Sequence, residues 1–402
     1  MGASLHDGVL TTRRGEALPG TFGADDHVLR WPREVFRQRL ADLINAPQQL
    51  TPGWAEHVEL FLYDAFDSNQ PVDAFRSLST SPVIDPWGAA APPTRTQVPP
   101  KRRYLIDLLQ AADSFPHEIQ RRPYRSQRSR SDGAATAMSM SATIARFISL
   151  ITDLDERGYF ERAFQKDCVD DPRSIDPSVL IEEEIGASDL WPLSIGRLMD
   201  DLDVFMDVIE VLGEFVAAPQ NRSNHSYGGC GWHHGDFNIQ MGRDIYFWLV
   251  NRLLDRSSIN LRLATSGEDR GRLIEVHGDE RNDFVTATIE GADQHTRSPI
   301  EHAVALFRRR GATVEDKRSA CTALAGVLEL RRSLLKEGLY RRDEGALFQI
   351  ANEFDVRHRS ESQKGDYDPI FLDWIFWWYL GTIELTDRII ARQAEVGSKP
   401  PS

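Results

Sequence analysis

Apolar residues recur at helical spacing along most of the chain. Residues 201–217 give the clearest case, because their apolar side chains fall three or four positions apart and Pro219 follows the end of the repeat. The same pattern predicts helices over residues 32–46, 53–66, 101–113, 134–150, 155–165, 176–186 and 238–255. Period-two alternation predicts one β-hairpin, with strands at residues 259–264 and 272–277. The pattern therefore predicts a mainly α protein, built of helical domains with a small β-hairpin insert.

Residues 298–402 contain four amphipathic segments, each opened by a helix-capping signal. Ser298 and Glu301 form a capping-box pattern, and Thr313 precedes a second helix that ends at Gly338. Asp343 precedes a third helix, and Asp368, followed by proline, opens a fourth. Four amphipathic helices with short connections indicate an antiparallel four-helix bundle at the C-terminal end of the chain.

Changes in composition divide the chain into four parts. Residues 1–30 are glycine-rich and aperiodic, so we expect them to be poorly ordered. Residues 31–133 are a helical segment with proline-rich and arginine-rich linkers, because seven prolines fall between residues 71 and 100. Residues 134–297 form an acidic helical domain that carries the hairpin, and residues 298–402 form the bundle.

Composition and charge narrow the class of protein. The 402 residues carry a formal net charge of −14, and residues 153–214 hold 18 acidic and 5 basic side chains, which is nearly the whole imbalance. A hydrophobic fraction of 41% excludes collagen-like and wholly disordered chains. No apolar core of a secretory signal and no membrane-length apolar run is present, and the three cysteines are widely spaced. We therefore expect a cytoplasmic protein with reduced thiols and no membrane contact.

Arginines also cluster locally, although the chain as a whole is acidic. Arg121, Arg122 and Arg125 belong to a basic island without an intervening acid. Because salt screens charges over about 8–10 Å, such a patch can bind nucleic acid despite the total charge. The alternative interpretation is a solvated helix face next to a loop. The acidic middle domain could equally mimic nucleic acid or bind a basic partner.

The chain lacks the phosphate-binding loop, the dinucleotide-binding glycine pattern, the esterase nucleophile elbow and the metalloprotease helix motif. The candidate catalytic residues are Arg357 and His358, with Arg359 beside them as a nucleic-acid-binding cation. Metal-independent RNA cleavage needs a proton-transfer group and a cation for the phosphorane, which these residues would supply. The alternative is that Arg357 pairs with a neighbouring carboxylate and His358 caps a helix end.

A helical bundle with this polar Arg-His step resembles the HEPN superfamily of bacterial abortive-infection and toxin proteins. The resemblance covers about residues 299–392 and implies that Arg357 is the motif arginine and His358 the polar residue after it. Where ribonucleases of the superfamily carry a further histidine, this chain has Ser362, Gln363 and Lys364. This departure favours a binding or regulatory variant as the alternative to an enzyme.

A second candidate site follows the acidic domain. Cys230, His233, His234 and Asp236 combine ligand types that zinc accepts, and glycines around them allow a tightly wound loop. Cys230 and His233 supply half of a tetrahedral site, which His225, His234 or Asp236 would have to close. The alternative is a glycine-rich loop covering the helix at residues 238–255. We therefore predict no cofactor, with zinc as the alternative.

The sequence thus predicts a defence or toxin-type protein that acts on RNA as a metal-independent endoribonuclease. A homodimer is expected, because one Arg-His step supplies too few proton-transfer groups and a two-fold axis doubles them. The competing hypothesis is a non-enzymatic regulatory or interaction protein that binds nucleic acid or a protein partner. A third hypothesis is a zinc-dependent hydrolase that uses the loop at residues 230–236.

Overall fold

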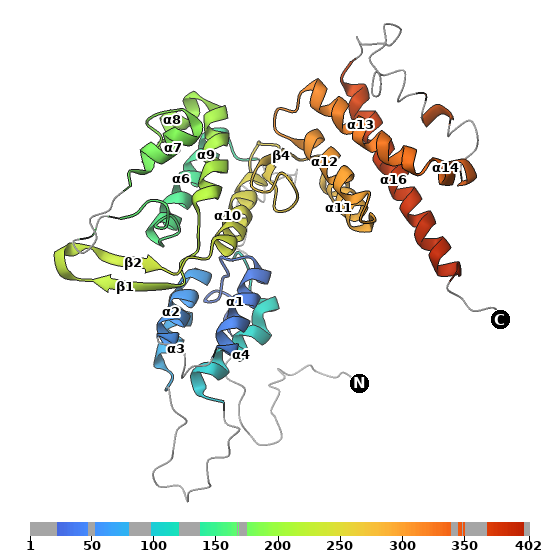
Figure 1. Ribbon diagram of the computed structural model, residues 1–402. Coiled ribbons are helices and arrows are strands. Elements are labelled where there is room, and N and C mark those ends of the chain that lie inside the picture. The colour runs from blue at the N-terminus through green and yellow to red at the C-terminus, as the bar shows by residue number, and fades with distance from the viewer. Residues whose placement is uncertain are drawn as a thin grey trace, which may run out of the picture. The chain divides into compact units, whose positions relative to one another are not determined.

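The computed structural model describes residues 22–46, 53–79, 98–119, 137–166, 168, 175–338, 345–347, 349 and 368–397. The fold is mainly α with two small antiparallel hairpins, which confirms the predicted fold class (Figure 1). The chain divides into two compact units, Met1–Leu249 and Val250–Ser402, and helix α10 (Ile239–Leu254) runs through the boundary. Among the described helices, none combines the length and the apolar character that a bilayer crossing requires.

The boundary between the two units follows Leu249, whereas the sequence predicted divisions at residues 133/134 and 297/298. Contacts within the first unit cross the first of these predicted divisions. Tyr159, from the predicted acidic domain, donates its hydroxyl to Asp64, from the predicted N-terminal segment, at 2.6 Å, and both residues are buried. Arg157 also pairs with Asp64, at 3.5 Å. The two segments therefore share one core, although their compositions differ.

Helices make up most of the first unit. Its described helices are α1 (Arg33–Asn45), α2 (Trp54–Ala65), α3 (Gln70–Ser77), α4 (Pro100–Ala111), α6 (Met140–Glu156), α7 (Pro177–Ile185), α8 (Ile195–Asp200) and α9 (Leu202–Phe215). Helix α3 lies where the sequence predicted only a proline-rich linker, because Pro71 is accommodated in the first turn of the helix. Packing also begins earlier than residue 31, since Leu29 is fully buried and its N–H donates to Pro116.

The first unit also contains a hairpin that the pattern of apolar residues does not predict. Strands β1 (Asn221–His225) and β2 (Gly231–Gly235) pair antiparallel, and the short 3₁₀ helix η2 (Tyr227–Gly229) joins them. Apart from Trp232, the two strands consist of polar residues and glycine, so they lack the alternation that marks a half-buried strand. Gly229 and Gly231 take positive φ angles of 75° and 78°, which only glycine adopts freely. The glycine-rich loop of the sequence is therefore a hairpin.

The second unit contains the hairpin that the sequence did predict and a group of packed helices. Strands β3 (Leu261–Leu263) and β4 (Leu273–Glu275) pair as expected. The helices are α11 (Asp279–Gly291), α12 (Arg297–Arg308), α13 (Val314–Leu330), α14 (Arg332–Gly338) and α16 (Ile370–Gly397). Helix α13 packs on α12 and α16, and Phe307 stacks on Phe376 with ring centroids 3.7 Å apart.

The starts of these helices match the sequence only in part. Thr313 and Asp316 form a reciprocal capping box before α13, as the sequence predicts for Thr313. Helix α12 instead begins at Arg297, and Asp293 accepts hydrogen bonds from the N–H groups of the turn before it, so the Ser298 capping box is wrong. The helix predicted from Asp343 lies largely outside the described residues.

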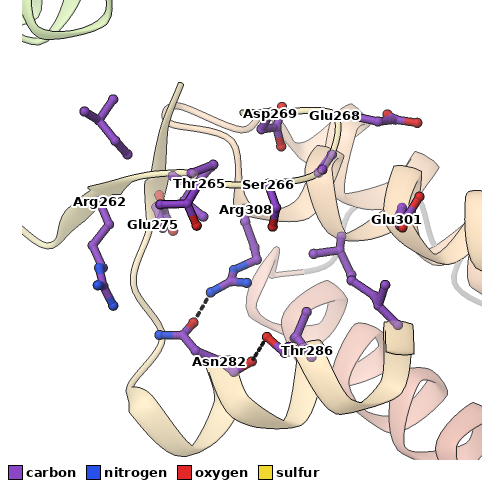
Figure 2. Close-up of a pocket in the computed structure, with 18 of the residues that line it drawn as sticks. Arg262, Thr265, Ser266, Glu268, Asp269, Glu275, Asn282, Thr286, Glu301 and Arg308 are labelled. Atoms are coloured by element: carbon purple, nitrogen blue, oxygen red, sulfur yellow. Dashed lines mark hydrogen bonds between the residues drawn. The ribbon is translucent and has the colours of Figure 1, made fainter. Parts of the chain in front are cut away.

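Beside the β3–β4 loop, α11 and α12 line a cavity of about 340 Å³ (Figure 2).

Candidate functional site

The structure tests only part of the sites that the sequence predicts. The residues predicted for RNA cleavage and for nucleic-acid binding lie outside the described residues; they are Arg357, His358, Arg359, Arg121, Arg122 and Arg125. The residues of the predicted zinc half-site, Cys230, His233, His234 and Asp236, all lie in the described part of the first unit. The candidate site is therefore built around them.

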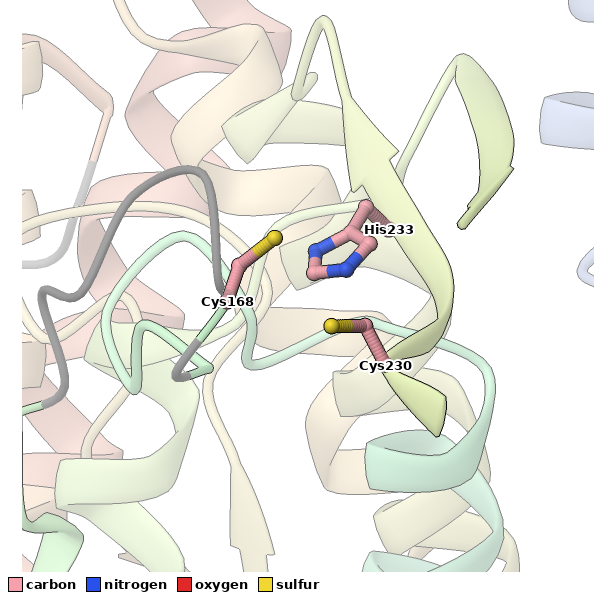
Figure 3. A group of neighbouring side chains, drawn as sticks. All are labelled: Cys168, Cys230 and His233. Atoms are coloured by element: carbon pink, nitrogen blue, oxygen red, sulfur yellow. The ribbon is translucent and has the colours of Figure 1, made fainter. Parts of the chain in front are cut away.

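Three metal-ligating side chains meet at the end of the β1–β2 hairpin. One ligand atom each of Cys168, Cys230 and His233 lies within 4.8 Å of the other two (Figure 3). A tetrahedral zinc ion with bonds of about 2.0–2.3 Å spaces its ligand atoms about 3.3–3.8 Å apart, so a small contraction would close the group on a metal. His225 Nδ1 lies 3.5 Å from Cys168 Sγ, and its ring centroid lies 4.7 Å from that of His233. His225 is thus a candidate for the fourth ligand.

The pairing of the two strands explains this meeting. The register places Ser223 opposite His233 and His225 opposite Gly231. Side chains on an antiparallel pair alternate between faces, so His225 and His233 share one face of the hairpin. The connection between the strands supplies Cys230 at the same end. Local sequence therefore brings three of the four candidate ligands together.

Cys168 is the ligand that the sequence analysis missed. It is buried at 7% exposure and reaches the hairpin from a distant part of the chain. The sequence offers only two thiol partners for Cys230, and nothing local distinguishes Cys168 from Cys321. Cys321 is buried in the core of the second unit, where burial raises the pKa of its thiol to about 12. A neutral thiol of this kind is a poor metal ligand.

Glu161 lies beside His233, the histidine of this group. His233 Nδ1 lies 3.7 Å from Glu161 Oε1, and His233 Nε2 is buried without a hydrogen-bond partner in the described part of the chain. Burial alone would raise the pKa of Glu161, but hydrogen bonds from the ring and backbone of His234 outweigh it and lower the pKa. Metal-bound histidines usually donate their second ring N–H to a carboxylate; here Glu161 lies beside His233 but, at 3.7 Å, beyond hydrogen-bonding distance.

His234 and Asp236 do not join the group, which corrects two of the four predicted ligands. His234 Nδ1 lies 2.8 Å from Glu161 Oε2, and the ring packs against Gly158, where an added Cβ would lie only 2.3 Å from Nδ1. Asp236 accepts a hydrogen bond from the side-chain amide of Asn221. Both side chains thus have other partners, and neither belongs to the group of Cys168, Cys230 and His233.

The other face of the hairpin carries an arginine that forms no ion pair within the described residues. The guanidinium of Arg222 lies 4.3 Å from the ring centroid of Trp232 and 5.0 Å from that of Tyr63. Within the described residues, Arg222 makes no hydrogen bond or ion pair, and burial lowers its pKa. It lines a cavity of about 270 Å³ together with Arg76 and Arg157.

The two neighbouring arginines are compensated, so Arg222 is the cation available to a ligand. Arg76 pairs with Glu59 at 2.8 Å, and Arg157 pairs with Asp153 at 3.1 Å. Aromatic rings on both sides hold the Arg222 guanidinium in one place at little entropic cost. Trp232 is 48% exposed, so part of its indole is accessible to a planar ligand. The face combines a fixed cation with a stacking surface.

Comparison of the chain with protein-family models, with curated proteins and with solved structures finds no match. The functional argument therefore depends on the geometry alone.

Proposed function

We propose that this protein binds single-stranded nucleic acid through a β-hairpin that a zinc ion holds in place. One observation carries the proposal. The β1–β2 hairpin presents thiol and imidazole groups on one face and, on the other, Arg222, which lies over Trp232 and forms no ion pair within the described residues. A metal that fixes the hairpin also fixes this second face.

The chemistry of the ligand set supports zinc. Two thiols and one or two imidazoles are the donors that structural zinc sites use, and carboxylates do not enter the group. With His225 as fourth ligand, the set is Cys₂His₂ and closed, which is typical of a structural site. The hairpin has few buried apolar side chains to hold it otherwise, since its residues are half-buried or exposed. Zinc ligation supplies stability that its own packing lacks.

The other face supports a nucleic-acid ligand. Phosphate groups pair with a fixed guanidinium, and bases stack on exposed aromatic rings at about 1–3 kcal/mol per base. Arg222 and Trp232 offer both contacts side by side. The acidic residues of the same unit lower its overall affinity for polyanions, but charges beyond about 8–10 Å are screened at physiological salt. Local contacts at the hairpin therefore dominate binding.

Zinc content tests the metal site. Purified wild-type protein should contain one zinc ion per chain by elemental analysis, and Cys230→Ser should lose it. Cys321→Ala, which removes a thiol from the other unit, is the matched control and should keep the metal. Loss of zinc in His225→Ala identifies His225 as the fourth ligand. A metal-free wild type, or a Cys230→Ser variant that keeps its zinc, contradicts the proposal.

Binding of a labelled oligouridine, followed by fluorescence anisotropy, tests the nucleic-acid face. Arg222→Gln should weaken binding about tenfold, or about 1.4 kcal/mol. The slope of the logarithm of the association constant against the logarithm of the salt concentration should become less negative by about 0.7, because one phosphate contact is lost. Arg146→Gln, at an exposed arginine on α6, is the matched control and should change neither value. Equal affinities for wild type and Arg222→Gln would remove this face as the binding site.

The endoribonuclease hypothesis built on Arg357 and His358 stays a prediction from the sequence. Cleavage of total RNA in the presence of EDTA, compared between wild type and His358→Ala, tests it independently of the hairpin.

A further inference from the structure

A cavity in the second unit contains a half-buried arginine that forms no ion pair within the described residues. Arg308 extends from the end of α12 into the cavity of about 340 Å³ between α11 and the β3–β4 loop (Figure 2). Its Nη2 donates to the side-chain oxygen of Asn282, a neutral group. Its Nε is buried without a hydrogen-bond partner, and no described carboxylate forms an ion pair with it. A buried N–H group without a partner is unfavourable, and an anion that enters the cavity would supply the missing acceptor.

A second cation and two hydroxyl groups face the same space. Arg262 lines the cavity from β3, and burial together with the charge of Arg262 lowers the pKa of Arg308. Thr265 and Ser266 point into the cavity from the loop above Arg308 (Figure 2). Two guanidinium groups and two hydroxyls match the oxygens of one carboxylate or phosphate group.

The remaining walls restrict the rest of the ligand. Val285, Val304 and Ala305 form an apolar side, so the cavity suits an organic molecule better than a bare inorganic ion. The volume is at the low end of the range for small-molecule sites, about 300–1,000 Å³. A polymer such as nucleic acid therefore does not fit.

Acidic side chains line the same cavity and select the charge of the ligand. Glu268 Oε2 lies 3.0 Å from His302 Nδ1. Asp269 forms no ion pair within the described residues, and burial raises the pKa of its carboxyl group. Glu275 and Glu301 add further negative charge. A ligand with several negative charges would be repelled, but an ammonium group would be attracted. The lining therefore favours a ligand that carries both charges.

We propose that this cavity binds a small zwitterion of the amino-acid class, with Arg308 and Arg262 contacting its carboxylate and Asp269 contacting its ammonium group. The site lies wholly within the second unit and does not depend on the metal or on nucleic-acid binding.

Isothermal titration of the full-length protein with each of the twenty L-amino acids tests the proposal. At least one should bind saturably, and Arg308→Gln should weaken that binding at least tenfold. Propionate and propylamine, which each carry only one of the two charges, should bind far more weakly than the amino acid. Arg392→Gln, at an exposed arginine on α16 that does not line the cavity, is the matched control and should retain the affinity.

Folding is a separate readout, because Arg308 forms no ion pair within the described residues that the variant would break. Arg308→Gln should therefore melt close to the wild-type temperature. Arg308→Lys, which keeps the charge but loses the forked geometry, should bind with intermediate affinity. The proposal is overturned if no amino acid binds, if Arg308→Gln binds as well as the wild type, or if propionate alone binds equally well.

Discussion

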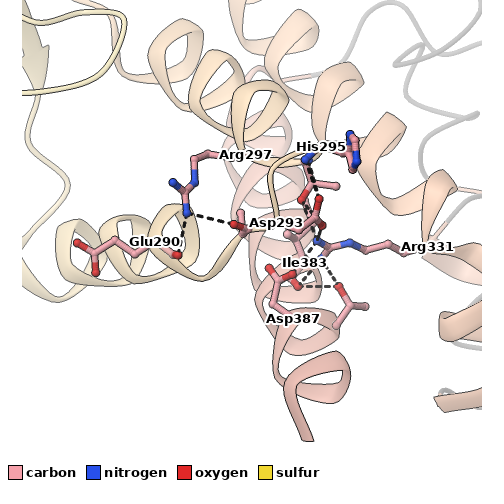
Figure 4. Close-up of polar contacts among 10 residues, drawn as sticks. Glu290, Asp293, His295, Arg297, Arg331, Ile383 and Asp387 are labelled. Atoms are coloured by element: carbon pink, nitrogen blue, oxygen red, sulfur yellow. Dashed lines mark hydrogen bonds and ion pairs between the residues drawn. The ribbon is translucent and has the colours of Figure 1, made fainter. Parts of the chain in front are cut away.

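At the scale of single residues, Arg331 shows how one buried side chain joins distant elements of the second unit. It lies between α13 and α14 with a side-chain exposure of 6%. Its guanidinium pairs with Asp387 at 2.6 Å and with Asp293 at 3.1 Å, and it donates to Thr386 and to the Ile383 carbonyl (Figure 4). These contacts are coupled, because the same guanidinium takes part in all of them.

Replacing Arg331 with methionine should lower the free energy of unfolding of the second unit by about 3–5 kcal/mol, because Asp387 would keep a buried charge without a partner. Urea denaturation followed by tryptophan fluorescence measures the change. Arg332→Met is the control, since Arg332 is 43% exposed and its surface pair with Glu329, at the end of α13, is worth about 0.5 kcal/mol or less. Similar losses in the two variants would show that the buried network adds no specific stability.

At the scale of elements, the start of α13 is specified by two residues close in sequence. Thr313 Oγ1 accepts from the N–H of Asp316 at 3.1 Å, and Asp316 Oδ2 accepts from the N–H of Thr313 at 2.9 Å. These bonds satisfy two N–H groups that the helix cannot pair internally. The bond from the Thr313 N–H, together with one that the Thr313 hydroxyl donates to Asp316 Oδ2 at 2.8 Å, holds the pKa of Asp316 below its ordinary value.

Thr313→Ala should cost about 1 kcal/mol of unfolding free energy at neutral pH. The pKa of Asp316 is lower in the folded than in the unfolded protein. The stability that its ionised carboxylate adds is therefore complete above the unfolded pKa of about 3.9 and is lost as the pH falls through the folded pKa. The difference between wild type and Thr313→Ala should therefore shrink in strong acid. Thr322→Ala, inside α13, should not destabilise the helix, since alanine is the better helix former. An equal loss at both positions would refute a capping role.

At the scale of the whole molecule, each of the two units has its own buried core. The first unit contains the candidate zinc group, and the second contains Arg331 and the cavity around Arg308. The zinc group involves only residues of the first unit. Its effect on stability should therefore remain within that unit.

Removing the metal with a chelator should raise hydrogen exchange in β1, β2 and the turn after α6, where Glu161 lies, while exchange in α13 and α16 stays unchanged. Mass spectrometry of exchanged peptides measures both regions in one sample. Cys230→Ser should reproduce the pattern without a chelator. A uniform rise across both units, or none in the hairpin, would contradict a local structural metal.

The sequence by itself determined the local features, because periodicity, caps and turns act over a few residues. It predicted α9, the start of α13 and the β3–β4 hairpin from such signals. Only the tertiary structure decided which distant side chains meet. Cys168 joins Cys230 and His233, and Arg222 stacks between Tyr63 and Trp232, through contacts between segments far apart in the chain. No local pattern encodes such meetings, since they depend on the packing of the whole unit.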